Sequence, residues 1–139
     1  MRSTMSNTET LITNLGKKIG LPHLKLDEDG TCSLDIEEEF ILTIAVNKQD
    51  EMILFAHLPD IEIDKRLTGY QLLLQANLLG KGTGNAALAM TEGDNRPALN
   101  SRFSASELDF QMFEERLDEF IKLVKLWSLT INSFNTSQY

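Results

Sequence analysis

The chain has 139 residues, 42% of them apolar and three of them proline, and its formal net charge is −8. This composition predicts one folded domain over residues 1–139, with flexible ends at 1–7 and 135–139. The negative charge argues against a nucleic-acid-binding protein, because binding to phosphate backbones depends on Lys and Arg. No run approaches the ~20 apolar residues of a membrane-spanning helix, and the N-terminus lacks a hydrophobic signal region. Cys32 is the single cysteine. It excludes an internal disulfide and favours a reducing compartment, so we expect a cytoplasmic protein.

The first sixty residues predict a helix and three strands. Ser6-Asn7-Thr8-Glu9 has the form of a capping box and predicts a short amphipathic helix that ends near Gly20. An acidic turn follows at Asp27–Gly30. Alternating apolar residues then predict strands at Cys32–Ile36, Phe40–Val46 and Met52–Leu58. Their short connections favour an antiparallel meander.

The segment Leu67–Leu79 predicts a helix that is apolar on almost every side. Such a helix is normally buried, and in a chain this short a second subunit can supply the cover. The alternative is a monomer that buries all of these apolar side chains in its own core. Gly80–Gly84 ends the helix, and two further strands are predicted at Ala86–Thr91 and Ala98–Phe103.

The last segment predicts a long helix behind a second capping box, Ser104-Ala105-Ser106-Glu107. Its apolar stripe consists of Phe110, Phe113, Leu117, Phe120, Val124, Trp127, Ile131 and Phe134. A coiled coil is one interpretation of this spacing, but we favour a helix laid across a sheet, because the stripe is aromatic rather than Leu/Ile. The order α-β-β-β-α-β-β-α predicts an α+β fold with three helices and a mostly antiparallel five-stranded sheet.

The sequence carries no recognised catalytic or metal-binding signature. The segment Gly80–Gly84 contains a lysine, Lys81, among its glycines and could suggest a phosphate-binding loop. It follows a helix, however, and lacks the glycine spacing of such a loop. The two histidines, His23 and His57, lack the partners of a zinc site, and the acidic turn lacks calcium-loop spacing. Cys32 lies in phase with the apolar residues of its strand, which indicates a core residue rather than a nucleophile. We therefore expect no enzyme, no cofactor and no bound metal.

An unrecognised small α+β enzyme is the competing hypothesis. It would require a cleft in which His57 meets Asp35 or Glu37.

Several segments carry a resemblance to a known family. They are Ile19-Gly20-Leu21-Pro22, the passage from Leu24 to Leu34, and above all Leu74-Gln75-Ala76-Asn77-Leu78-Leu79-Gly80-Lys81-Gly82-Thr83-Gly84. Together with the element order and the C-terminal helix, they resemble the Tir-chaperone-like (class I) family, the small acidic chaperones of bacterial type III secretion. The resemblance extends from about Glu9 to Ile131 and includes no catalytic motif.

The resemblance implies a homodimer in which the central helix and the following strand pack against their two-fold mates. On this sequence the implied dimer interface comprises Tyr70, Leu73, Leu74, Asn77, Leu78, Ala87, Leu88 and Ala89. It also implies ATP-independent binding of the N-terminal region of a secreted effector, held in extended form and presented to the export apparatus, whose ATPase is a further candidate partner. The implied effector-binding residues are Leu11, Leu15, Leu34, Ile36, Leu42 and Ile44, although some of these must be core. Neither nucleic-acid binding nor membrane insertion is implied. A regulatory protein of the same fold, which sequesters a transcription factor or another regulator, is the alternative.

Overall fold

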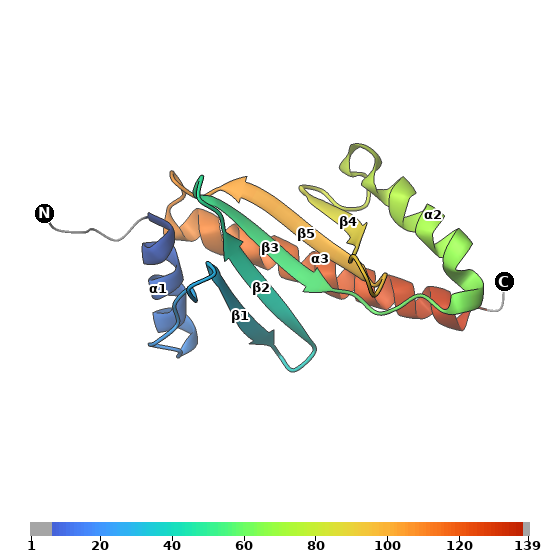
Figure 1. Ribbon diagram of the computed structural model, residues 1–139, viewed down its shortest axis with the longest axis horizontal. Coiled ribbons are helices and arrows are strands. Elements are labelled where there is room, and N and C mark those ends of the chain that lie inside the picture. Colours follow the sequence, from blue (N-terminus) through green and yellow to red (C-terminus); the bar gives the residue numbers. More distant parts are fainter. Residues whose placement is uncertain (1–6, 138–139) are drawn as a thin grey trace, which may run out of the picture. The chain divides into compact units, whose positions relative to one another are not determined.

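The computed structural model describes residues 7–137 and contains three α-helices and five strands (Figure 1). The α-helices are α1 (Asn7–Ile19), α2 (Arg66–Asn77) and α3 (Phe110–Thr136). The strands are β1 (Thr31–Ile36), β2 (Phe40–Val46), β3 (Glu51–His57), β4 (Ala86–Met90) and β5 (Pro97–Ser104). Single turns of 3₁₀ helix flank α2 at Ile63–Lys65 and Leu78–Gly80. No helix within residues 7–137 is long and apolar enough to cross a membrane.

The strands form one sheet in the order β1-β2-β3-β5-β4. The two edge strands each pair antiparallel with their neighbour, with Leu34 opposite Leu42 at one edge and Leu88 opposite Leu99 at the other. The predicted α+β fold, with three helices and a five-stranded antiparallel sheet, is confirmed. Strand positions agree with the sequence to within one residue at each end, because the alternation of apolar residues determines them.

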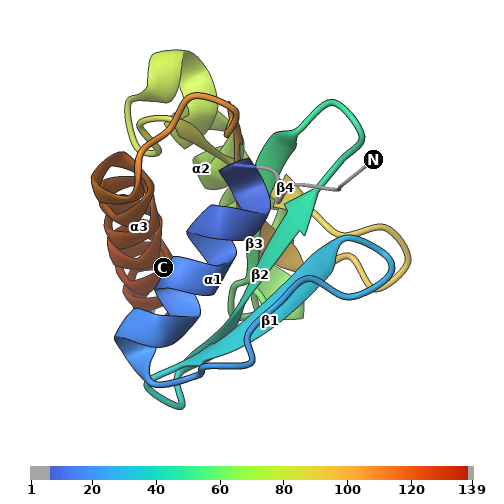
Figure 2. The same cartoon turned by 90° about the vertical axis from the view of Figure 1, so that its left-hand side faces the viewer.

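The described residues form two compact units, which we treat separately. The first unit contains residues up to 54 together with 102–118, and so includes α1, β1, β2 and the beginning of α3. Asn7, the first residue of α1, donates its side-chain N–H groups to the carbonyl oxygens of Ala105 (2.6 Å) and Leu108 (3.0 Å). Thr8 donates its hydroxyl to the Asp50 carboxylate (2.6 Å). These bonds fix the start of α1 against the segment that leads into α3 (Figure 2).

The second unit contains residues 55–101 and the remainder of the chain from 119, and so includes α2, β4 and most of α3. Trp127 of α3 donates its indole N–H to the carbonyl oxygen of Gly82 (2.8 Å). A Cβ atom at Gly82 would lie 2.9 Å from the Cβ of Ala76 and 3.2 Å from the Trp127 ring. Glycine is therefore required here by close packing, in addition to its role in ending the helix.

Two helix ends differ from the predictions. Ser6, the first residue of the first predicted capping box, lies outside the described residues. The second capping box, Ser104–Glu107, is wrong: α3 begins at Phe110, and Asp109 caps it by accepting the N–H of Met112 (2.8 Å). An aspartate three residues before a free amide caps a helix as well as a serine does. Asn7 and Asn135, which fall within the predicted flexible ends, belong to α1 and α3.

The two faces of β2 provide a test of which side forms the core. Ile44 is fully buried, whereas Ile41 is 52% exposed. We expect Ile44→Ala to lower the free energy of unfolding by about 2–4 kcal/mol, because it leaves a cavity in the core. Ile41→Ala should change it by less than about 0.5–1 kcal/mol. Urea denaturation followed by circular dichroism measures both, and equal effects would contradict the assignment of the faces.

Candidate functional site

The outer face of α2 is an apolar surface that the chain does not cover. The exposed apolar residues of this surface are Leu67 and Leu74 of α2, with Leu78 and Leu79 of the 3₁₀ turn that follows it. On the opposite face, Gly69 and Leu73 are buried within the second unit. The alternative in which one chain buries this whole helix in its own core is wrong, and burial of the helix by a second subunit stays a prediction. Exposed leucines along a helix and the turn after it are typical of an interaction surface.

The edge strand β4 is joined to α2 by one side chain. Asn77 accepts the N–H of Leu88 (2.7 Å) and donates to the carbonyl oxygen of the same residue (2.8 Å). Leu88 points inward, while Ala87 and Ala89 are exposed on the other side of the strand. We define the α2–β4 surface as the four exposed leucines with Ala87 and Ala89.

The predicted dimer residues divide between this surface and the core. Four of the eight, Leu74, Leu78, Ala87 and Ala89, lie on the α2–β4 surface. Tyr70 and Asn77 are half-buried, whereas Leu73 and Leu88 are buried within the second unit. Leu67, Leu79 and Met90 are exposed on the same elements but were absent from the predicted set. Leu79 adopts a positive φ of 56° in the 3₁₀ turn, and its side chain is exposed to solvent. The glycines that follow Leu79 in the sequence were the signal that the helix ends here.

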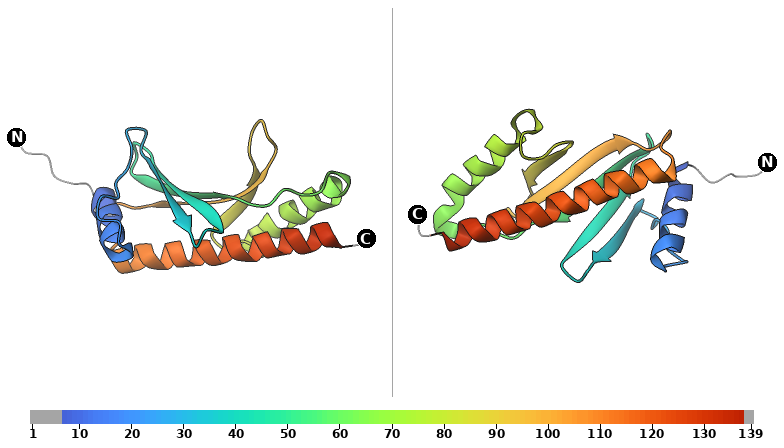
Figure 3. Two further views of the ribbon diagram at one scale, coloured as in Figure 1. Left: turned by 90° about the horizontal axis from the view of Figure 1, so that it is seen from below. Right: turned by 180° about the vertical axis from the view of Figure 1, so that it is seen from behind.

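The segment just before α2 is hydrogen-bonded to the C-terminal end of α3. Lys65 donates its Nζ to the carbonyl oxygens of Phe134 (3.0 Å) and Asn135 (2.9 Å), and also to that of Ser137. The Asn135 side chain accepts the N–H of Glu62 (2.9 Å) and donates to the carbonyl oxygen of Asp60 (2.8 Å). Figure 3 shows these two helix ends meeting. A cation suits the free carbonyls of a helix C-terminus, so this contact sets where α2 begins.

The predicted effector-binding residues are mostly core residues. Leu11, Leu15, Leu34, Leu42 and Ile44 are at most 6% exposed in the chain. These five side chains stabilise the first unit and have almost no surface to offer a ligand; Ile36 is half-buried. Alternation identified the faces of the strands, but an apolar face is normally the covered one.

Other apolar residues of the first unit are at the surface. Ile19, Leu21, Ile41 and Met112 are each about half exposed. For Ile41 the signal was present in the sequence, since it is the apolar residue out of phase with Leu42 and Ile44.

The free edge of β1 presents backbone groups. Val46 donates its N–H to the Gly30 carbonyl oxygen (2.8 Å), which sets the alternation of the β1–β2 ladder. Cys32 and Leu34 therefore direct their backbone groups toward β2, and Ser33 and Asp35 direct theirs to the open edge. Thr31 is already engaged there, because its carbonyl oxygen accepts the N–H of Asp27 (2.7 Å). Ser33 and Asp35 are thus the positions at which an added strand would bond.

Three side chains with potential chemistry, Cys32, His57 and Asp35, have different local surroundings. Burial, and to a smaller extent the charge of Asp27, raises the pKa of the Cys32 thiol to about 11, so it is protonated and unreactive at neutral pH. His57 is exposed, with its ring 4.9 Å from that of Phe55. Asp35 accepts the N–H of Glu38 (2.9 Å), which shapes the β1–β2 turn. Among residues 7–137, His, Cys, Asp and Glu form no group of three that could hold a metal ion.

Comparison with known proteins supplies the family. A family model described as the Tir chaperone protein (CesT) family matches residues 10–128. A comparison with curated protein sequences finds no significant match.

Solved structures share the fold at low sequence identity. The chain is similar to one in the crystal structure of the ExsC–ExsE complex, with a TM-score of 0.78, 20% identity and coverage of 91% of this chain and 97% of that one. It is similar to a chain of the HopA1–SchA chaperone–effector complex, with a TM-score of 0.75, 19% identity and coverage of 91% and 98%. A third is in the heterodimeric ExoU–SpcU complex from the type III secretion system of Pseudomonas aeruginosa, with a TM-score of 0.65, 17% identity and coverage of 88% and 96%.

The contact between Lys65 and the end of α3 leads to a stability prediction. Lys65→Met should lower the free energy of unfolding by about 1–2 kcal/mol, because it leaves helix carbonyls without their cationic donor. Lys81→Met removes the same charge from an exposed position of the second unit and should cost less than about 0.5 kcal/mol. Urea denaturation of both variants tests this, and equal midpoints would contradict the role given to Lys65.

Proposed function

The chain belongs to the Tir chaperone protein (CesT) family, and we propose that it is a type III secretion chaperone. In this proposal it binds the N-terminal region of one or more secreted effectors, keeps that region soluble and non-globular, and presents it for export. The family match over residues 10–128 is the observation that carries the proposal. The similarity to a chain of a chaperone–effector complex supports it.

The proposed chaperone is a homodimer formed through the α2–β4 surface. Four exposed leucines on a short helix and the 3₁₀ turn after it would be costly to leave in water, and a two-fold mate would cover them with the same residues. The alanines of β4 extend the surface with small side chains that allow close approach. Lys65 would contribute indirectly, by fixing the end of α2 that starts this surface.

The proposed mode of effector binding is strand addition at the open edge of β1. Backbone groups of Ser33 and Asp35 would bond the effector in extended form, and the half-exposed Ile19, Leu21 and Ile41 would contact its apolar side chains. A disordered segment loses conformational entropy when it binds, so a long apolar contact is needed to offset the loss. Nucleotide is not required in this scheme, and hand-over to the export ATPase would follow binding.

The homodimer is tested by one leucine of α2. Leu74→Glu should give a monomeric or insoluble chain, because it places a carboxylate at the centre of the proposed interface. Leu129→Glu on α3 is the matched control, since both leucines are 70% exposed and both belong to the second unit. Light scattering coupled to size-exclusion chromatography measures the mass. A soluble Leu74→Glu dimer, or equal disruption by both variants, would exclude this interface.

The effector-binding function is tested by affinity purification of the tagged protein from its own bacterium, without added nucleotide, with partners identified by mass spectrometry. We expect a stoichiometric secreted protein that is retained through its N-terminal region. Ser33→Pro should abolish its recovery, because proline removes an outward N–H but is tolerated on an edge strand. Ser33→Val keeps the N–H and should retain the partner. Recovery of a transcription regulator instead would favour the regulatory alternative.

A further inference from the structure

A pocket opens between α1 and the segment that leads into β1. It measures about 350 Å³ and lies entirely within the first unit. Its lining residues are Glu9, Ile12 and Thr13 of α1 and Lys25, Leu26, Asp27, Glu28 and Gly30 of the following segment. This volume is at the lower end of the range of about 300–1,000 Å³ for ligand pockets, and it suits one long side chain better than a folded surface.

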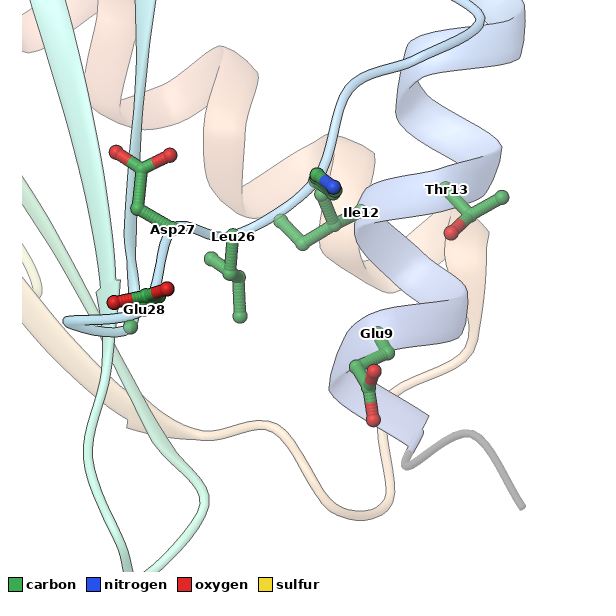
Figure 4. Close-up of a pocket in the computed structure, with 8 residues that line it drawn as sticks. Glu9, Ile12, Thr13, Leu26, Asp27 and Glu28 are labelled. Atoms are coloured by element: carbon green, nitrogen blue, oxygen red, sulfur yellow. The ribbon is translucent and has the colours of Figure 1, made fainter. Parts of the chain in front are cut away.

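The interior and the rim of the pocket differ in chemistry. Figure 4 shows Leu26 beside Ile12 of α1, with Asp27 and Glu28 on the turn that follows Leu26 and Glu9 on α1. Glu9, Asp27 and Glu28 contribute three carboxylates, against the single ammonium group of Lys25. Between residues 7 and 137, Asp27 and Glu28 form no ion pair with Lys25 or with another cation. The pocket thus combines an apolar wall with an excess of negative charge at its mouth.

The turn that carries Asp27 and Glu28 is held in place by backbone bonds. Asp27 donates its N–H to the carbonyl oxygen of Thr31 (2.7 Å) and accepts the N–H of Gly30 (2.9 Å). These bonds close the turn and fix the backbone from which the Asp27 and Glu28 side chains extend at the pocket. The same turn leads directly into the open edge of β1, and a segment bound along that edge would therefore have the pocket near its end.

The charge of the protein is distributed unequally between its parts. The sequence stretches 1–54 and 102–118, which supply the first unit, contain fifteen Asp and Glu against seven Lys and Arg, a net charge of −8. The stretches 55–101 and 119–139 contain six of each, a net charge of zero. The entire excess of negative charge therefore belongs to the part of the chain that carries the pocket. Such a field attracts cationic partners and repels anionic ones.

We propose that this pocket binds an arginine or lysine side chain of the effector segment. The aliphatic part of that side chain would lie against the half-buried Leu26 and Thr13, above the buried Ile12, while its cation would meet the carboxylates of Asp27 and Glu28. An arginine suits the site best, because its guanidinium group bonds two carboxylates at once. The inference rests on the proposed chaperone function. It adds that the bound segment is basic next to its extended, strand-forming part.

The pocket is tested without the effector, by two-dimensional NMR of the isotope-labelled full chain. The probes are the N-acetyl methylamides of arginine, citrulline and norleucine, titrated to tens of millimolar at low salt. Citrulline has the shape of arginine without its charge. We expect arginine to shift the amide signals of Ile12, Thr13, Leu26 and Gly30 in a saturable manner, and citrulline and norleucine to bind at least about three-fold more weakly.

Charge-removing variants identify the carboxylates. Asp27→Asn combined with Glu28→Gln should weaken the binding of the arginine probe by about three- to ten-fold. Glu115→Gln combined with Asp118→Asn is the control, because it removes the same charge from exposed positions of the first unit. It should leave the binding unchanged.

Three results would overturn the proposal: equal binding of citrulline, stronger binding of norleucine, or no saturable shift at these signals. Failure here with recovery of a secreted partner from the bacterium would refute the basic pocket alone. Failure of that recovery would refute the chaperone function.

Discussion

Burial of one side of α3 is the constraint on which both units of this protein depend. Phe113 and Leu117 lie in the core of the first unit, while Phe120, Val124, Trp127 and Ile131 lie in the core of the second. Each unit therefore completes its core with a different stretch of one helix. Because six large side chains follow the same stripe, helix formation and core formation are inseparable in this chain. In the sequence, the aromatic character of this stripe is the feature that favours a helix packed on a sheet over a coiled coil.

Some apolar surfaces remain exposed because the chain has too few elements to cover both sides of each one. A chain of this size with a five-stranded sheet can cover one face of its short central helix but not the other. The inner face of α2 is covered by the second unit, and Gly69 allows Ile61 and Phe134 to approach it closely. Its outer leucines keep an apolar surface that suits a copy of the same chain. The open edge of β1 leaves unpaired backbone groups that suit an extended polypeptide. The two surfaces belong to different units, so the proposed dimer and the proposed ligand would not compete for the same residues.

The distribution of charge agrees with the assignment of self-association to the second unit and of ligand binding to the first. A net charge of −8 on the part that carries the β1 edge would discourage two such edges from pairing with each other, which is the usual hazard of an exposed strand. A neutral second unit lets two copies approach through their leucines without long-range repulsion. The same arrangement would favour a basic segment at the pocket beside α1. Solubility, self-association and choice of ligand would then depend on where the charges lie rather than on their sum.

The sequence by itself determined the elements, their order and the fold class, because helix and strand periodicities are local properties of the chain. It also determined the absence of recognised catalytic motifs and the resemblance that the family match bears out. It could not assign faces. Leu42 and Ile44 alternate as regularly as binding residues would, yet they are buried, while Leu74 and Leu78, in a segment that is apolar on almost every side, are exposed within one chain. Only the tertiary structure decided this, because periodicity identifies a side of an element, and exposure depends on which distant segment packs against that side. The pocket also depends on tertiary structure: Ile12 and Leu26 are separated by more than a dozen residues, and only folding brings them together beside the carboxylates of Asp27 and Glu28.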